Sequence, residues 1–293
     1  MGFRTILKSY QKNPLKVWKR LRSDKCELRK NLSPSLIEDF RGRVAANAQY
    51  RVHQGETVYI LCTGPSIRDI EVEPLVGKTL ISVSHFAQHP ACGRLRPRYH
   101  FLAANHSPFG ADHYERYIRS LAEWNWNFTC FFGYAPYAHS ILNYFASHGT
   151  PAFDYSYYRT DLNHFRIPAS YLLPRAWDFT KTIPPSNTVL VQAIQFAVFA
   201  GASRIVLLGC DHDYLHHFGS GGIPHFYEAD KGHDDTEHLK GINTERWFQI
   251  LANRWETYRR MREYCDARGV RILNATTGSK LDVFPMMNPR DIA

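Results

Sequence analysis

The chain of 293 residues lacks the features that mark a membrane-spanning or secreted protein. No apolar run approaches the roughly 20 residues that a membrane-spanning helix needs. The first residues are basic, but they lack a continuous apolar region followed by a cleavage site. Six cysteines are present, and they are scattered without a C-x-x-C pair. These absences disfavour both classes and favour a reduced, cytoplasmic protein.

The glycine-rich motifs of the commonest nucleotide-binding folds are also missing. The turn Gly64-Pro65-Ser66 is not followed by Gly-Lys-Ser/Thr at the spacing that a Walker A loop requires. The G-x-G-x-x-G pattern of dinucleotide-binding folds does not occur in the chain. These absences disfavour ordinary ATPases and NAD-dependent enzymes.

What the chain does have is material for one large core, since 44% of its residues are hydrophobic and 14% are aromatic. Strand-like apolar runs alternate with helical patterns. The strands are expected at 58–62, 79–84, 99–104, 127–132, 203–209 and 270–274, and the main helices at 112–124, 187–200 and 245–268. This alternation predicts an α/β fold with a single doubly wound, mainly parallel, Rossmann-like sheet in one domain, 33–293.

Two of the expected strands end abruptly in small or acidic residues. The first runs into Thr63, Gly64, Pro65 and Ser66, and the second runs through Leu208 into Cys210-Asp211-His212-Asp213. In an open α/β sheet, ligands bind at the carboxyl ends of the strands. Glycine lets backbone N–H groups approach a phosphate, and Ser66 could cap a following helix or donate its hydroxyl. The pattern predicts a site for a phosphorylated ligand.

Other polar residues follow the neighbouring strands. Ser84 follows the strand at 79–83, and Asn105 follows the strand at 99–104. In a parallel sheet both reach the same edge as Gly64, where an amide and a hydroxyl would suit a base, a ribose or a sugar. The alternative is that both residues only form turns.

The two acids of the second strand end, Asp211 and Asp213, have the spacing of carboxylates that hold Mg²⁺ or Mn²⁺ against a diphosphate. The alternative is that Asp211 accepts backbone N–H groups at the strand end. We favour the alternative and expect that no metal cofactor is required.

The stretch 214–243 has no clear helical or strand period and is rich in histidine and glycine. A loop of this length in a compact domain is typical of a lid over a binding site. The histidine spacing matches no standard zinc site. Imidazole titrates near neutral pH, so a histidine here could act as a general base, with His233 and His238 as the candidates.

Most of the net charge of +9 lies in the first residues. Residues 1–30 carry ten basic side chains against two acidic ones, and apolar residues recur at helical spacing. The segment 1–32 is therefore predicted to be a basic amphipathic arm that holds the protein peripherally on the anionic inner membrane surface. The alternative is an ordinary helix docked on the body. No nucleic-acid-binding motif is present, so no nucleic-acid partner is expected.

With these residues laid out, the chain resembles the bacterial sialyltransferases of glycosyltransferase family 42 and the related fold of 6-hydroxymethylpterin diphosphokinase-like proteins. The resemblance rests on Thr63-Gly64-Pro65-Ser66, on Asn105, on the unit from Asn187 to Asp211, and on 269–276. Thr63 and Ser84 stand where that family prefers asparagine.

The resemblance implies a glycosyltransferase of polysaccharide biosynthesis. It would move a sugar, such as a sialic acid from a cytidine-monophosphate donor, to a hydroxyl of a lipid-linked or cell-surface glycan. By this resemblance, the donor contacts are Gly64, Pro65, Ser66 and Asn105, the leaving phosphate is stabilised by Tyr214 or Tyr227, and the base is His233 or His238. Thr63, Ser84, Asn187 and Asp211 complete the expected substrate-binding set. Two alternatives remain open, a Mg²⁺-dependent diphosphokinase acting on a pterin-like alcohol and a nucleotide- or glycan-binding protein without turnover.

Overall fold

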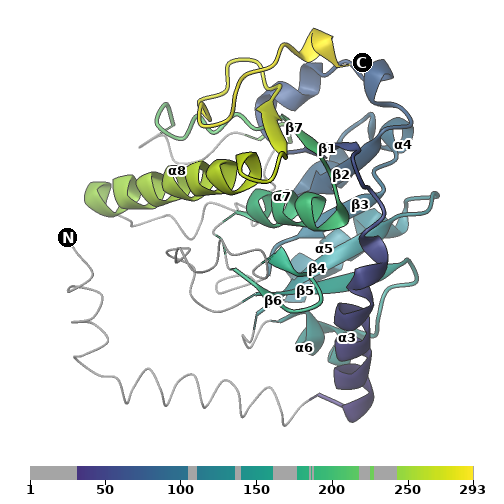
Figure 1. Cartoon of the computed structure of the whole chain (residues 1–293). Coiled ribbons are helices and arrows are strands. Elements are labelled where there is room, and N and C mark those ends of the chain that lie inside the picture. Colours follow the sequence, from purple (N-terminus) through teal and green to yellow (C-terminus); the bar gives the residue numbers. More distant parts are fainter. Residues whose placement is uncertain are drawn as a thin grey trace, which may run out of the picture.

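The computed structural model describes residues 32–104, 111–135, 140–160, 177–184, 186, 188–217, 225–227 and 243–292. These residues build one eight-stranded sheet with the strand order β6-β5-β4-β3-β2-β1-β7-β8, flanked by helices (Figure 1). The pairing of every neighbouring strand is parallel. The predicted α/β, Rossmann-like fold class is confirmed.

The strands are short, as is usual for parallel sheets that are buried on both faces. They are β1 (Thr57–Leu61), β2 (Thr79–Val83), β3 (Tyr99–Leu102), β4 (Thr129–Tyr134), β5 (Tyr155–Thr160), β6 (Thr182–Ile183), β7 (Arg204–Leu208) and β8 (Arg271–Asn274). Six of the eight were expected from their apolar runs. The exceptions are β5 and β6.

The helices of the described part are α3 (Pro34–Ala46), α4 (Cys92–Leu95), α5 (Ala111–Ala122), α6 (Ile141–His148), α7 (Val189–Ala200) and α8 (Thr244–Asp266). Ser33 caps α3 by accepting a hydrogen bond from Leu36 N at 3.2 Å. Asn243 caps α8 in the same way. None of the described helices is both long and apolar enough to cross a membrane.

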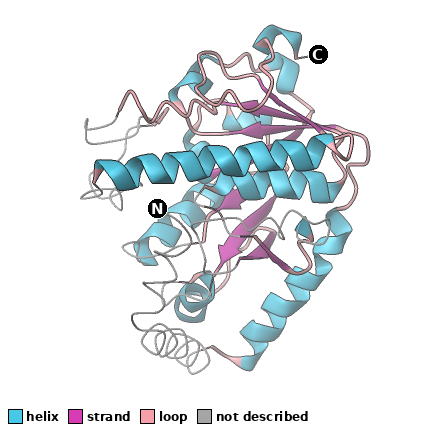
Figure 2. Ribbon diagram, turned by 60° about the vertical axis from the view of Figure 1, so that its left-hand side comes forward, coloured by secondary structure: helices cyan, strands magenta, loops and turns pink. Residues whose placement is uncertain are grey.

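Two packed layers cover the sheet. On one face α7 and α8 pack against the alternate side chains of β1, β2 and β7, including Val58, Ile60 and Ile205 (Figures 1 and 2). On the other face, residues of α5 and α6 pack on β3 to β5, and Tyr59 and Leu61 of β1 meet the short helices after β1 and β2. The side chains of each strand thus alternate between the two layers.

The chain order places a topological switch point beside the central strand β1. From β1 the chain builds β2 to β6 outward on one side, and it then returns to place β7 and β8 on the other side. Neighbouring connections therefore leave in opposite directions from β1 and β7. Ligands of open α/β sheets bind at such a point, outside the carboxyl ends of the strands.

The predicted basic arm, 1–32, lies outside the described residues except for Leu32, the first residue described. The boundary between this arm and the domain is therefore not tested. Both remain predictions.

Candidate functional site

The carboxyl ends of β1 and β7 are joined by direct hydrogen bonds between their loops. The Asp211 carboxylate accepts from Ser66 N at 3.1 Å and from Ser66 Oγ at 2.8 Å. Gly64 N donates to Gly209 O at 2.9 Å, which extends the pairing of β1 with β7 past the last strand residues. The two strand ends that stood out in the sequence therefore form one structural unit.

Glycine is required at position 64 because Asp211 and Gly209 lie too close for a side chain, and not because of its backbone angles. Its φ of −68° is open to any residue. A Cβ atom at this position would overlap Asp211 Oδ2 and lie 2.7 Å from Gly209 O, well inside van der Waals contact. The missing side chain lets the loop sit directly on β7.

The prediction for Ser66 needs a correction. The segment after β1 is a 3-10 helix of five residues, Pro65–Asp69, and its N-cap is Gly64. Ser66 does not cap a helix, because its hydroxyl donates to Asp211. Its hydroxyl therefore serves to hold the loop.

Both acids of the strand end hold protein donors. The pKa of Asp211 is raised by burial, and the two hydrogen bonds from Ser66 offset part of that effect. Asp213 Oδ2 lies 3.1 Å from His217 Nε2. Among the described residues no three His, Cys, Asp or Glu side chains are grouped as a metal site would need. The geometry supports the reading of Asp211 as an acceptor at the strand end.

A described piece of the long loop, 225–227, lies on the β1 loop. Phe226 N donates to Thr63 O at 3.1 Å, and Arg68 Nε donates to Phe226 O at 2.7 Å. His225 Nδ1 lies 3.4 Å from Thr63 Oγ1, and its ring stacks on Tyr227 at 4.9 Å. The predicted Tyr227 therefore lies beside the loop after β1, and so does His225, a histidine that the sequence reading did not select.

The end of β2 adds an aromatic cluster on the same side. Ser84 adopts a left-handed φ of 51°, which turns the chain sharply after the strand. The next residue, His85, stacks on Tyr117 of α5 at 4.5 Å and approaches Tyr227 at 4.7 Å. Desolvation lowers the pKa of His85 to about 3, and the neighbouring His113 adds to the effect. His85 is thus a neutral and very weak base, which makes it unsuited to general-base catalysis near neutral pH.

The residues that follow β7 contact α8. His212, with a left-handed φ of 52°, places its Nε2 2.7 Å from Tyr258 Oη. The Tyr214 ring lies beneath the guanidinium of Arg254, 4.6 Å from its Cζ. Burial raises the pKa of the Tyr214 hydroxyl. Tyr214 therefore keeps its proton and can donate a hydrogen bond.

The sequence-predicted site residues are thus placed in part. The structure gathers Thr63, Gly64, Pro65, Ser66, Ser84, Asp211, Asp213, Tyr214 and Tyr227 at the carboxyl edge of the sheet. Asn105, Asn187, His233 and His238 lie outside the described residues. Their roles remain predictions.

Sequence reasoning assigned no role to His85, Tyr117 or Arg254. His85 directly follows Ser84, at a strand end that the sequence had indicated. Tyr117 and Arg254 lie inside helices, where only the folded structure shows which side chains face the sheet edge.

Desolvated histidines give the fold a predictable sensitivity to acid. Burial lowers the pKa of His85, His100 and His212 to about 3 each. The unfolded chain binds a proton at each histidine below about pH 6.5, whereas the folded protein does not. The free energy of unfolding should therefore be highest above pH 6.5. As the pH falls from there toward 3, it should drop by up to about 1.4 kcal/mol per pH unit for each of these histidines. Urea unfolding at pH 7.5, 6 and 5 measures this, and a constant midpoint would contradict it.

Comparison with known proteins gives a narrow result. No family model and no curated protein matches the chain. The chain is similar to two solved structures of the sialyltransferase CstII from Campylobacter jejuni, in complex with cytidine-5'-monophosphate and with CMP-3FNeuAc. In both cases the identity is 12% and the TM-score 0.44, covering 80% and 79% of this chain and 86% of the other. At this distance the function has to be argued from the residues of the chain itself.

Proposed function

We propose that the protein is a glycosyltransferase that binds a nucleotide-sugar donor at the carboxyl ends of β1 and β7. It would transfer the sugar to a hydroxyl of a lipid-linked or cell-surface glycan, and the donor would be a cytidine-monophosphate sugar. The alternative enzyme, a Mg²⁺-dependent diphosphokinase, gains no support from the similarities or from the described acids.

One observation carries the proposal. The Gly64-Pro65-Ser66 loop is held against β7 by Asp211, directly at the topological switch point of the sheet. This is where open α/β sheets bind their nucleotides. The loop has the residues through which the chain resembles the family 42 sialyltransferases.

The described tyrosines supply a means of stabilising the leaving group. In sugar transfer, negative charge develops on the nucleotide phosphate as the glycosidic bond breaks, so hydrogen-bond donors aimed there contribute most. Tyr214 follows β7 and lies against Arg254 of α8, and Tyr227 lies against His85 after β2. Either hydroxyl can donate to the phosphate without a metal ion.

The acceptor hydroxyl must lose a proton during transfer, and we propose that a histidine of the loop 214–243 takes it. His233 and His238 remain the candidates from the sequence, and His225 joins them because of its position beside Thr63. Replacement of each by glutamine, followed by pH–rate profiles, identifies the base. The base variant should lose about a hundredfold or more in turnover and lose the acidic limb of the profile.

The proposal is tested by screening the purified protein against nucleotide sugars, with calorimetry for binding and donor hydrolysis for turnover. We expect one nucleotide class to bind and its sugar donor to be hydrolysed slowly in the absence of acceptor. Binding without any turnover would point to a nucleotide-binding protein. Binding of no cytidine, uridine or guanosine sugar would rule out the transferase.

Metal dependence is a separate prediction. Because both oxygens of Asp211 face Ser66 and Asp213 faces His217, we expect activity to survive a chelator. Asp213→Asn should then keep most of the turnover. The measurement is the initial rate with and without chelator, followed by Mg²⁺ or Mn²⁺. Activity that vanishes and returns with the metal would show that the acids bind a cation.

Membrane attachment is proposed for the basic segment 1–30. If the attachment is electrostatic, binding to liposomes should require anionic lipid and should weaken with salt, since exposed charges are screened over about 8 Å at physiological ionic strength. Equal binding of the full protein and a version beginning at Ser33 would refute it.

A further inference from the structure

Arg254 is the most deeply buried charge of the described protein. Its exposed fraction is 8%, and all other Asp, Glu, Lys and Arg residues in the described ranges are half-buried or exposed. Its Nε has no hydrogen-bond partner, and within the described ranges no carboxylate forms an ion pair with it. A buried cation of this kind is costly to hold without a counter-charge.

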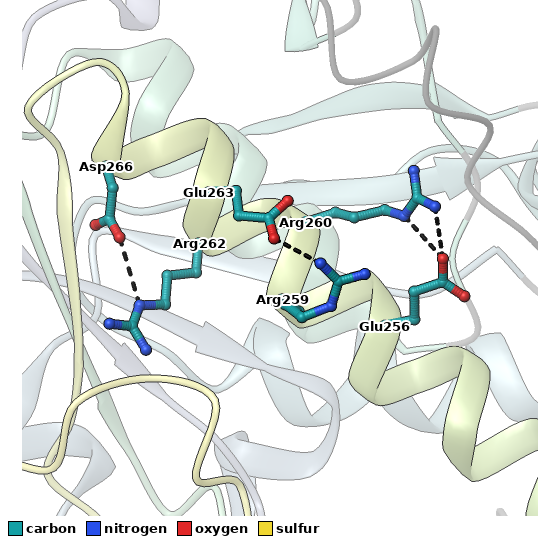
Figure 3. A network of polar contacts seen from close by, with 6 residues as sticks. All are labelled: Glu256, Arg259, Arg260, Arg262, Glu263 and Asp266. Atoms are coloured by element: carbon teal, nitrogen blue, oxygen red, sulfur yellow. Dashed lines mark hydrogen bonds and ion pairs between the residues drawn. The ribbon is translucent and has the colours of Figure 1, made fainter.

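Three other arginines of α8 show how an arginine of this helix is usually compensated. Figure 3 shows Arg259, Arg260 and Arg262, each paired with an acid four residues away at 2.5 Å, 2.6 Å and 3.4 Å. Arg254 has no such acid, because Ile250 and Tyr258 occupy the positions one turn away. Arg246 also has no acid one turn away, but it is only half-buried and its Nη1 bonds to Gln249 Oε1. Arg254 is the arginine of α8 that combines burial with the lack of such an acid.

The described neighbours of Arg254 do not neutralise it. Its guanidinium lies over the face of Tyr214, and a cation–π contact returns only part of the cost of burying a charge. The neighbouring His212 bonds to Tyr258 Oη. Burial, and secondly the charge of Arg254, lower the pKa of His212 to about 3, so this ring is neutral. A positive charge therefore remains at this place near neutral pH.

This charge lies at the edge of the sheet where the ligand is expected. Tyr214, beneath Arg254, follows β7 and is close enough to Cys62, at the end of β1, to interact with it electrostatically. Since α8 leads into the parallel strand β8, the half of α8 that contains Arg254 faces the carboxyl ends of the strands. Arg254, which has no counter-charge among the described residues, and the Gly64 loop thus lie at the same edge of the sheet.

We propose that Arg254 binds a phosphate group of the ligand that occupies the crevice between β1 and β7. The planar guanidinium matches two phosphate oxygens at once, and the Tyr214 hydroxyl beside it can donate a further hydrogen bond. The phosphate supplies the negative charge that the described protein does not. The inference deepens the proposed function, on which the identity of the phosphate carrier rests.

The test compares three probes, cytidine monophosphate, inorganic pyrophosphate and cytidine, by calorimetry at low salt. Arg254→Met removes the charge while keeping an apolar side chain of similar length. Arg260→Met removes a half-buried arginine of the same helix that is paired with Glu256. Arg254→Met should weaken both phosphate-bearing probes at least about tenfold and leave cytidine unchanged. Arg260→Met should bind all three like the wild type.

A circular dichroism spectrum and a melting curve establish that each variant is folded. If Arg254→Met does not fold, the affinities of Arg254→Lys are measured in its place. It keeps a charge but loses the two-pronged geometry, and should still weaken cytidine monophosphate severalfold. Wild-type affinity of the folded Arg254 variant for both phosphate probes would overturn the inference, and so would failure of both probes to bind the wild type. Pyrophosphate binding that depends on Arg254, without turnover of any nucleotide sugar, would keep the inference and remove the proposed function.

Discussion

Gly64→Ala is expected to reduce turnover about a hundredfold, because displacement of a positioning loop by about 1 Å has effects of that size. The new Cβ would overlap Asp211 Oδ2 and press on Gly209 O, so the loop and the end of β7 must separate. Overpacking of this kind also lowers the free energy of unfolding, by about 1–3 kcal/mol. Donor hydrolysis and urea unfolding measure the two effects.

Gly42→Ala is the matched control. Gly42 lies inside α3, and a Cβ there would meet nothing within 4 Å. This variant should be more stable than the wild type by about 0.5–1 kcal/mol, with unchanged turnover. If Gly64→Ala behaved like Gly42→Ala, the contact between the β1 loop and β7 would have no functional weight.

Asp211→Ala is expected to have the second large effect. It leaves Ser66 N without its acceptor in a partly buried position, at a cost of about 1–3 kcal/mol, and it frees the loop that the donor is proposed to contact. Asp211→Asn keeps an oxygen that can accept from Ser66 N, so it should lower stability less and retain activity. The loss of turnover should therefore follow the loss of the loop contact and not the loss of the negative charge.

A double-mutant cycle isolates this contact. Ser66→Ala removes the hydroxyl that donates to Asp211 Oδ2. The free energies of unfolding of the two single alanine variants and the double variant should show a coupling of about 1–2 kcal/mol. Additive effects would mean that the two residues act independently.

Much of the fold follows from the sequence because its central strands are aliphatic runs with clear ends. β1, β2 and β7 are of this kind, and their predicted positions are confirmed within one or two residues. β5 was missed because Tyr155–Thr160 is built from tyrosines and polar residues, without an aliphatic run. Tyr155 and Tyr157 nevertheless fill the core beside α3 and α6, and Tyr158 packs in the opposite layer with α7. Aromatic residues can form a buried strand that shows neither an apolar–polar alternation nor an aliphatic run in the sequence.

The sequence predicts which residues lie at the site where they directly follow parallel strands, because the ends of such strands meet at one edge of the sheet. That argument placed Gly64, Ser84 and Asp211 at one edge, and the structure confirms this placement. It could not show that Asp211 holds Ser66, because this hydrogen bond joins residues 145 positions apart. Arg254 was overlooked for a different reason. Its helix contains five arginines, and the sequence alone does not show which of them the fold buries.

The central claim is that a nucleotide binds at the switch point between β1 and β7, and a crystal structure with cytidine monophosphate and a divalent ion tests it most directly. The account predicts the nucleotide against Thr63, Gly64 and Ser66, with its phosphate beside Tyr214 and no metal between the phosphate and Asp211. A nucleotide bound away from this edge, or a cation bridging Asp211 and Asp213 to the phosphate, would contradict the account.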